Sequence, residues 1–294
     1  MFIAGIDGGG THTRIEIRDM ENHFLRSGEF GPFNINAIGE TAFAALLREV
    51  FSWCGDMAQC ARLCVGGAGI SNPKLQQILA RELEQAGFRG SWKLCGDQEI
   101  ALRGAMDGAG VVLIAGTGSI CFGKNNAGQT ARSGGFGHLI DDGGSGYALG
   151  RDVLSAAVRT IDGRSHSPAI LEAVYTRLGG STPGDIISFV YGPDTDKSAI
   201  AKFAGIALEF AALDDKEAAR ILERNAEDLG ELVATVQKQL DLPGCPIALL
   251  GGLLSSENPY RTVVAEQLSR LGPVQSPAHD ALWGAAQMAW ENLP

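Results

Sequence analysis

The chain of 294 residues has no apolar run that approaches the length of a membrane span. Its first residues, Met1 to Asp7, read as a short strand rather than as a signal peptide. Basic residues are in the minority, with 24 lysines and arginines against 34 aspartates and glutamates and a net charge of −10. This balance argues against nucleic acid or an anionic membrane as the main partner. We therefore expect neither a membrane nor a nucleic-acid partner.

Cysteine pairs at metal-binding or redox spacing are also absent. The six cysteines form no CxxC pair, and several of them lie within apolar runs. Buried free thiols are the favoured interpretation, and metal ligands are the alternative. Because reduced thiols are typical of the cytoplasm, we expect a cytoplasmic location.

Glycine, in contrast, is abundant and clustered. Five of the clusters formed by the 40 glycines follow one another along the chain at 8–10, 66–67, 134–135, 143–144 and 251–252. Glycines that follow apolar runs allow tight turns and a close approach of the backbone to a ligand. The clustering therefore favours a ligand site built largely from backbone groups.

An internal repeat relates two parts of the chain. An apolar strand, a hairpin rich in glycine and threonine, and a second strand occur at residues 2–18 and again at 111–122. Helical patterning follows each copy, over 41–51 and 145–161. The repeat predicts two related α/β domains that face each other across a cleft. Chance similarity of two glycine-rich hairpins is the alternative.

The first hairpin carries a carboxylate directly before a run of glycines. Residues 7–13 read Asp-Gly-Gly-Gly-Thr-His-Thr, so successive backbone N–H groups could bind phosphate. Asp7 could supply the hard oxygen that Mg²⁺ on a nucleotide needs, and the hydroxyls of Thr11 and Thr13 could add contacts. An ordinary Asp-Gly turn is the alternative.

The second hairpin, residues 116–119, keeps the glycines but has Ala115 in place of the aspartate. A single metal-binding carboxylate is what we expect between two phosphate loops, because a second one would repel a triphosphate. A further strand at 247–250 ends in the pair Gly251-Gly252. A side chain there would block the close approach of a flat base and ribose.

Asp97 follows a predicted strand at 92–95 and opens a predicted helix at 98–105. Phosphoryl transfer to a hydroxyl needs a carboxylate that accepts the proton, and Asp97 is the candidate for this general base. A helix N-cap is the alternative, and both roles can hold together.

Other polar residues lie in loops that are rich in glycine or in apolar residues. Asn34 and Asn36 are suited to contact vicinal hydroxyls, with turn formation as the alternative. Asp142 could accept hydrogen bonds from ligand hydroxyls, and Ser145 could cap the helix that follows.

Taken together, these segments resemble the actin, hexokinase and Hsp70 superfamily, and most closely the N-acetylglucosamine kinase branch of the BadF/BadG/BcrA/BcrD ATPase family. The motifs that carry the resemblance are IDGGGTHTR (6–14), GGAGI (66–70), GDQEIALRGA (96–105), VVLIAGTGSI (111–120), SGGFGH (133–138), GGSGYALG (143–150) and LLGGLL (249–254). They span nearly the whole chain in the expected order.

The resemblance implies two actin-like (ribonuclease H-like) α/β domains that flank a cleft for ATP and substrate. The first domain would comprise residues 1–112 with a C-terminal helix at 280–294, and the second would comprise 113–279. ATP and Mg²⁺ are the implied cofactors, a small-molecule amino sugar is the implied partner, and a homodimer is the implied assembly. The expected activity is phosphorylation of the 6-hydroxyl of N-acetylglucosamine or glucosamine. The alternatives are a kinase for another hexose and an ATPase activator or regulatory protein of the BadF type without sugar kinase activity.

The resemblance also implies roles for single residues. Asp97 would act as the base toward the sugar hydroxyl, and Asp7 would lie near Mg²⁺. The implied ATP contacts are Gly8, Gly9, Gly10, Thr11, Thr13, Gly116, Thr117, Gly118, Ser119, Gly251 and Gly252. The implied sugar contacts are Asn34, Asn36, Gly69, Ser133, Gly135, Asp142 and Gly146.

The sequence departs from related families at three points. Gly143 stands where related kinases often have a glutamate, which leaves the sugar and the role of Asp142 open. Cys121 has no spaced partner, so the 4Fe–4S cluster of dehydratase activators is not expected. No cysteine cluster follows His138, which argues against the zinc-bearing ROK kinases.

Overall fold

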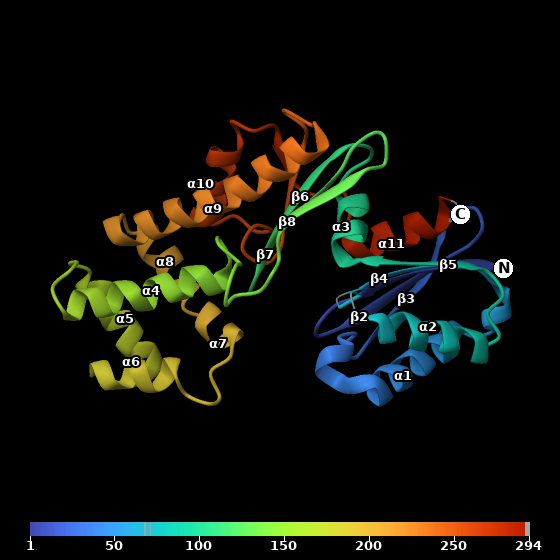
Figure 1. Ribbon diagram of the computed structural model, residues 1–294, viewed down its shortest axis with the longest axis horizontal. Helices are drawn as coiled ribbons and strands as arrows, with labels where there is room; N and C mark the ends of the chain where they lie inside the picture. Colours follow the sequence, from blue (N-terminus) through green and yellow to red (C-terminus); the bar gives the residue numbers. More distant parts are fainter. Residues whose placement is uncertain (68, 71, 292–294) are drawn as a thin grey trace. The chain divides into compact units, whose positions relative to one another are not determined.

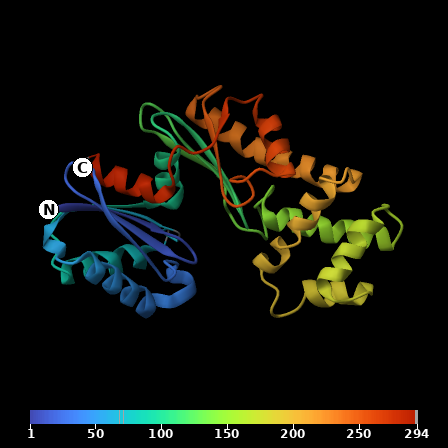
Figure 2. The ribbon, with the colours of Figure 1, turned by 180° about the vertical axis from the view of Figure 1, so that it is seen from behind.

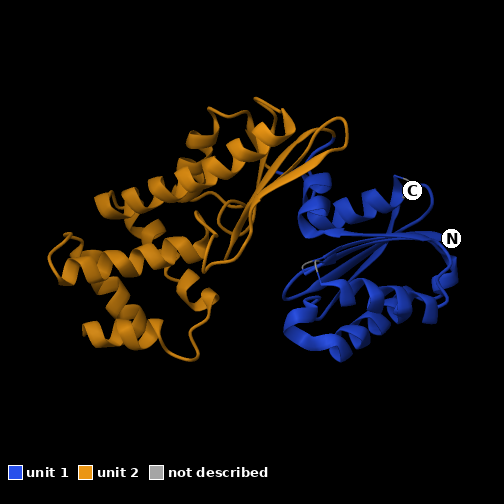
Figure 3. Ribbon diagram, viewed as in Figure 1, with its two compact units in different colours: residues 1–107, 277–294 blue, residues 108–276 orange. Residues whose placement is uncertain are grey.

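Figure 1 shows the computed structural model of the chain, which describes residues 1–67, 69–70 and 72–291. The chain divides into two compact units (Figure 3). Unit 1 comprises residues 1–107 and 277–294, and unit 2 comprises residues 108–276. Each boundary falls a few residues before the one expected from the sequence. No described helix is both long and apolar enough to cross a membrane.

Unit 1 is built on a five-stranded sheet in the order β3-β2-β1-β4-β5. Its strands are β1 (Phe2–Gly8), β2 (Thr13–Arg18), β3 (Phe24–Phe30), β4 (Cys60–Gly67) and β5 (Ser91–Gly96). Hairpins join the first three strands in antiparallel pairs, whereas β1, β4 and β5 run parallel. Parallel strands place their carboxyl ends at the same edge, which is where ligands bind in open α/β sheets.

Helices cover both faces of this sheet (Figure 1). The pair α1 (Ile35–Cys54) and α2 (Pro73–Gln85) packs on one face, and α3 (Asp97–Ala105) and α11 (Ala281–Trp290) pack on the other. A short 3₁₀ helix (Met57–Gln59) precedes β4. Helix α1 begins before the predicted residue 41, but its backbone leaves the helical conformation at Gly39, with φ 80° and ψ 164°. Residues 292–294 of the predicted C-terminal helix lie outside the described residues.

Unit 2 repeats the same sheet topology. Its strands are β6 (Gly110–Ala115), β7 (Ser119–Lys124), β8 (Thr130–Gly134), β9 (Ile247–Leu250) and β10 (Val274–Gln275). Their order is β10-β9-β6-β7-β8, with antiparallel pairing through β6, β7 and β8 and parallel pairing through β6, β9 and β10. The first strand of each repeat is therefore central, and the internal repeat predicted from the two hairpins is confirmed.

The insertion between β8 and β9 is helical, as the pattern over 163–240 predicts. It contains α4 (Gly146–Ile161), α5 (Pro168–Leu178), α6 (Pro183–Val190), α7 (Lys197–Ala201), α8 (Ala204–Ala211) and α9 (Lys216–Leu240). Helix α10 (Pro259–Leu268) joins β9 to β10 and packs beside α9 (Figure 2). Ser145 caps α4 by accepting a hydrogen bond from the Ala148 N–H at 3.2 Å, as predicted. All six cysteines are buried and free, which confirms the favoured interpretation of their spacing.

Candidate active site

The two aspartates that the sequence singled out lie at the same edge of the unit 1 sheet. The strand register aligns Gly8 of β1 with Gly67 of β4, and Gly67 with Gly96 of β5. Asp7 therefore stands one residue before the end of β1, and Asp97 directly follows the end of β5. The structure brings together the carboxylates predicted for metal binding and for proton transfer.

Asp97 is the first residue of α3, while Gly96 occupies the cap position. One oxygen of Asp97 accepts a hydrogen bond from the Gln98 N–H at 3.0 Å, and part of the residue reaches solvent although protein surrounds the carboxyl group. Capping falls to Glu99, whose side chain accepts a hydrogen bond from the Gly96 N–H at 3.3 Å. The N-cap alternative does not account for Asp97.

The pKa of Asp97 is raised above its ordinary value. The larger cause is the protein around the carboxyl group, which excludes water from the charged form, and the negative charge of Asp7 adds to it. The hydrogen bond from Gln98 lowers the pKa, and its effect is smaller than that of burial and larger than that of Asp7. A carboxylate with a raised pKa is a stronger base, which suits a group that takes a proton from a hydroxyl.

An arginine that the sequence interpretation left without a role holds Asp7. Arg14 pairs with Asp7 across the first hairpin, and its Nη2 donates a hydrogen bond to Oδ2 of Asp7 at 2.7 Å. Its Nη1 donates to Oδ2 of Asp280 at 2.8 Å, and Asp280 caps α11. The signal was present in the sequence, because counting outward from the hairpin tip places residue 14 opposite residue 7.

Asp7 fits the role of a Mg²⁺ ligand. Its Oδ2 accepts the hydrogen bond from Arg14, while its Oδ1 accepts none from the described residues. The side chain is 17% exposed, so a ligand can reach it. A carboxylate oxygen is the hard donor that Mg²⁺ prefers.

The glycines of the first hairpin serve different purposes. A Cβ on Gly8 would lie 2.4 Å from the ring of Phe33, and a Cβ on Gly67 would lie 2.6 Å from the same ring. Phe33 is fully buried, so both glycines are required for its packing. Gly10 has open space around it, which leaves this position free to approach a ligand.

Some polar groups of the first hairpin are likewise bonded within unit 1, and others are open to a ligand. The Thr13 hydroxyl is buried and donates to the Gly31 carbonyl at 2.7 Å, so it is committed within unit 1. The Gly9 N–H donates to the His12 carbonyl at 2.9 Å. Thr11 is exposed. The backbone around Gly10 and Thr11 is therefore the part of this hairpin that is open to phosphate, whereas Gly9 and Thr13 shape the turn.

Three of the predicted sugar contacts lie together in unit 1. Asn34 caps α1 and accepts a hydrogen bond from the Asn36 N–H at 3.1 Å, and Asn36 accepts one from Asn72 at 2.9 Å. Gly69, with φ 76°, lies so close that a Cβ would stand 3.5 Å from Nδ2 of Asn36 and 3.8 Å from Oδ1 of Asn34. The turn-forming role of Asn34 therefore holds beside any role in ligand binding. Ala68, within the GGAGI motif, lies outside the described residues.

In unit 2 the second hairpin follows β6 and is held by the start of α4. The Gly116 carbonyl accepts a hydrogen bond from the Gly146 N–H at 2.7 Å, and the Thr117 carbonyl accepts one from the Tyr147 N–H at 3.3 Å. A Cβ on Gly146 would lie 3.0 Å from the Gly116 oxygen. Gly146, predicted as a sugar contact, thus supports the hairpin.

The glycine pair after β9 lies beside the same hairpin. Gly251 has φ 89°, and a Cβ there would lie 2.3 Å from the Ala115 carbonyl oxygen at the end of β6. Glycine is therefore required at position 251, where the loop after β9 passes the end of β6. Gly252 has open space around it, so Gly252 is the member of the pair with room for a ligand.

Asp142 lies against the second hairpin. It is 3% exposed with φ 62°, and a Cβ on Gly118 would lie 2.9 Å from its Oδ2. Its Oδ1 accepts a hydrogen bond from the Ser119 N–H at 3.4 Å, while the Ser119 hydroxyl donates to the Gly143 carbonyl at 2.7 Å. Asp142 therefore brings a carboxylate beside the second hairpin from a later loop, whereas the hairpin itself has Ala115 in place of the aspartate of the first.

Ser133 and Gly135 lie at the end of β8, where Ser133 pairs with Cys121 of β7. Gly135 has φ 77°, and a Cβ there would lie 2.9 Å from the Ile120 side chain. Both residues belong to unit 2. The predicted sugar contacts are therefore distributed over both units.

Comparison with known proteins places this arrangement in a family. The model of the BadF/BadG/BcrA/BcrD ATPase family matches residues 4–289. The chain belongs to this family. An N-acetylmuramic acid/N-acetylglucosamine kinase from Clostridium acetobutylicum is 31% identical over 87% of each chain. An N-acetyl-D-glucosamine kinase from Dictyostelium discoideum is 27% identical over 98% of this chain and 97% of its own.

A solved structure agrees with these two relatives. The crystal structure of a candidate N-acetylglucosamine kinase from Chromobacterium violaceum has a TM-score of 0.75 and 26% identity, and the match covers 98% of both chains. The family and the fold class predicted from the sequence are confirmed. The names of the relatives agree with the predicted class of enzyme, a sugar kinase.

Proposed function

We propose that this chain transfers the γ-phosphoryl group of ATP to the 6-hydroxyl of an amino sugar, N-acetylglucosamine or glucosamine. The observation that carries the proposal is the pair of aspartates at one edge of the unit 1 sheet. Asp7 is held by an arginine and has one oxygen that accepts no hydrogen bond from the described residues, and Asp97 has a raised pKa. The kinases named above, one for N-acetylglucosamine and one also for N-acetylmuramic acid, support an amino sugar as the acceptor.

In this proposal unit 1 binds the sugar and activates it. Asp97 accepts the proton of the attacking hydroxyl, and its exposed position leaves room for the sugar. The carboxamides of Asn34 and Asn36, next to the bare backbone of Gly69, offer both donors and acceptors to sugar hydroxyls. The Asn34 amide is already oriented by the backbone N–H of Asn36, and the Asn36 amide by the side chain of Asn72, which reduces the entropy lost on binding.

Unit 2 binds the nucleotide in this proposal. Within the second hairpin, the Gly116 N–H donates to the Gly118 carbonyl and the Ser119 N–H donates to Asp142. The N–H groups of Thr117 and Gly118 have no acceptor among the described residues and can donate to phosphate oxygens. The open position at Gly252 accommodates the base and ribose. Mg²⁺ held by Asp7 would neutralise charge on the phosphates during the transfer.

The remaining expectations are proposals of the same kind. A cytoplasmic location is supported by six buried thiols without a disulfide. A homodimer rests on the family resemblance.

A coupled assay of ADP release tests the proposal. The chain is mixed with ATP and Mg²⁺ and then with N-acetylglucosamine, glucosamine, N-acetylmuramic acid or glucose. We expect an amino sugar to raise the rate of ADP release above the rate without sugar. If no sugar raises that rate, the kinase proposal fails, and ATP hydrolysis that is independent of sugar would favour the activator alternative.

A further inference from the structure

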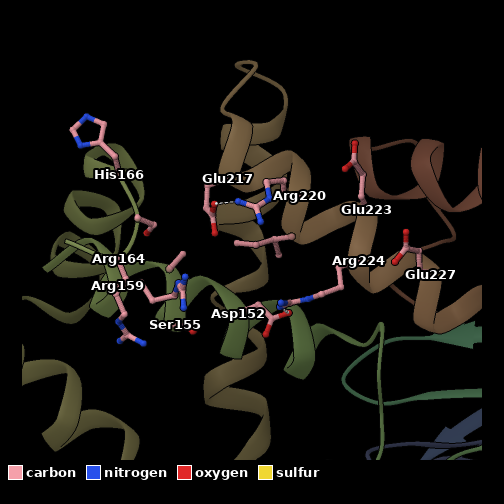
Figure 4. Close-up of a pocket in the computed structure, with 13 residues that line it drawn as sticks. Asp152, Ser155, Arg159, Arg164, His166, Glu217, Arg220, Glu223, Arg224 and Glu227 are labelled. Atoms are coloured by element: carbon pink, nitrogen blue, oxygen red, sulfur yellow. Dashed lines mark hydrogen bonds and ion pairs between the residues drawn. The ribbon is translucent and has the colours of Figure 1, made fainter. Parts of the chain in front are cut away.

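Unit 2 contains a cavity of about 630 Å³ between α4 and α9 (Figure 4). One wall comes from α4 and from the loop after it, and the opposite wall comes from the first turns of α9. Neither the second hairpin nor the glycine pair after β9 lines the cavity. The cavity is thus distinct from the proposed nucleotide site.

The cavity is lined by four arginines and one histidine, together with four carboxylates, in a chain whose net charge is −10. Its cationic or titratable basic lining residues are Arg159, Arg164, His166, Arg220 and Arg224. No lysine lines it. The guanidinium fork of arginine matches pairs of phosphate oxygens, which the ammonium group of lysine cannot do. The choice of side chain therefore points to a ligand with a phosphate group.

Two of these arginines are committed to carboxylates of the fold. Arg224 forms an ion pair with Asp152 of α4, which is buried and also accepts a hydrogen bond from Asn225 at 2.8 Å. Arg164 forms an ion pair with Asp162 at 2.6 Å. Both arginines therefore shape the walls of the cavity.

The other two arginines keep donors for a ligand. Within the described part of the chain, the Arg159 guanidinium makes no hydrogen bond and no ion pair. The pKa of Asp162 is lowered mainly by its direct partner Arg164, and the charge of Arg159 adds to this effect. Arg220 reaches Glu217 through one nitrogen at 3.3 Å, and its side chain is 77% exposed. Figure 4 shows Arg159 on the α4 side and Arg220 on the α9 side. Ser155 lies next to Arg159 in the lining and adds a neutral hydroxyl donor.

The acidic lining residues restrict where a phosphate can bind. Besides Asp152 and Glu217, the cavity is lined by Glu223 and Glu227 of α9. Figure 4 shows these two glutamates beyond Arg220, farther from the α4 wall. Repulsion from these two glutamates disfavours an anion at that end, whereas the charge of Glu217 is offset by its ion pair with Arg220.

We propose that this cavity binds a small phosphorylated molecule, with its phosphate group between Arg159 and Arg220. The volume exceeds that of a phosphate ion and is large enough for a sugar phosphate. Helix α4, which forms one wall, also holds the second hairpin through the Gly146 N–H. The proposal uses residues of unit 2 alone and does not depend on the sugar kinase activity.

Isothermal titration calorimetry of the full chain without nucleotide, at low ionic strength, tests the proposal with inorganic phosphate and with glucose 6-phosphate as probes. In the double variant Arg159→Gln/Arg220→Gln we expect both probes to bind at least about tenfold more weakly, because charge-assisted hydrogen bonds to phosphate are lost. Arg270→Gln, a change of an exposed arginine in the same unit, serves as the control and is expected to leave both affinities unchanged.

The hairpins can also bind phosphate, but the double variant leaves them intact. Any binding there persists in the variant and is measured as a separate event. A tighter affinity for glucose 6-phosphate than for inorganic phosphate would assign the cavity to a sugar phosphate, and equal affinities would assign it to the phosphate group itself. Unchanged affinity of both probes in a correctly folded double variant, or no binding of either probe to the native chain, overturns the proposal.

Discussion

The Arg14 guanidinium lies 2.7 Å from the Asp7 carboxylate and links it to Asp280, the cap of α11. This bridge joins the first hairpin to the last helix of the chain. Opposite charges stabilise each other more strongly when they are partly withdrawn from water, and the Asp7 side chain is only 17% exposed. Arg14 therefore positions the carboxylate that we propose as the Mg²⁺ ligand.

Replacing Arg14 tests this bridge. We expect Arg14→Met to lower the free energy of unfolding by about 1 kcal/mol, since the arginine is itself partly exposed and its ion pairs are partly screened. We also expect weaker Mg²⁺-dependent nucleotide binding, because Asp7 loses its orientation. Urea denaturation and nucleotide titration measure the two effects. Arg89→Gln, at another exposed arginine of unit 1, is the control, and an equal loss of stability there would remove the special role of Arg14.

Two glycines of the first repeat separate stability from binding. A Cβ on Gly5 would lie 2.1 Å from the Ala286 backbone nitrogen, whereas Gly10 has open space around it. We expect Gly5→Ala to lower the free energy of unfolding by about 1–3 kcal/mol or more, because the added methyl group would displace α11 from β1. Gly10→Ala should fold normally and bind nucleotide more weakly. Thermal unfolding and nucleotide titration of both variants check this contrast, which a normal melting temperature for Gly5→Ala would contradict.

Removing the charge of Asp97 tests its role as the base. Asp97→Asn is expected to lower kcat by roughly 10²- to 10⁴-fold while nucleotide binding is retained. The matched control is Asp107→Asn, at a carboxylate that is 89% exposed just beyond the same helix. Steady-state kinetics with the sugar found active decides the matter. Turnover near the native value in Asp97→Asn would exclude this aspartate as the base.

The same substitution has a predicted effect on stability. Because the pKa of Asp97 is raised by folding, the native state binds its proton more tightly than the unfolded state does. Protonated Asp97 therefore stabilises the native state at pH values below the ordinary aspartate pKa. This stabilisation is lost as the pH rises through the raised pKa of Asp97. At neutral pH Asp97→Asn should be more stable than the native chain, and this gain should shrink as the pH falls toward 4. Urea denaturation over that range would contradict the account if the gain grew on acidification.

Asp142 offers a test of the second hairpin. Its buried carboxylate accepts a hydrogen bond from the Ser119 N–H, so Asp142→Ala should loosen the hairpin and raise the KM for ATP by about tenfold. Asp142→Asn keeps an acceptor oxygen and should have a smaller effect. If both variants instead raise only the KM for the sugar, Asp142 contacts the sugar, as the family resemblance implies.

Local patterns were sufficient to predict much of the fold. The strand at 247–250 has the bounds read from the sequence, because it is a short apolar pattern closed by glycine. The last helix begins at Ala281, one residue after the expected start at 280. The repeated hairpins predicted two related α/β domains, although the strand order of the sheets was not predicted. The start of α1 was less accurate, since the break at Gly39 leaves only the later turns with a regular apolar spacing.

Contacts between distant segments could not be predicted in the same way. Glycine clusters indicated a ligand site, yet Gly8 and Gly67 are required for the packing of the Phe33 ring. Phe33 is distant from both glycines along the sequence. The carboxylate of Asp142 beside Gly118 depends on a chain path that no local pattern encodes. Only side chains on neighbouring strands, such as Asp7 and Arg14, were within reach of counting along the sequence.

The central claim is the transfer of phosphate to an amino sugar, and the most direct test identifies the product. The chain is incubated with ATP, Mg²⁺ and N-acetylglucosamine, and the products are analysed by two-dimensional ¹H–³¹P NMR, with glucosamine as a second acceptor. The account predicts a phosphorus resonance correlated with the protons on carbon 6 of the sugar. Consumption of ATP that yields inorganic phosphate and no sugar phosphate with either acceptor would contradict it.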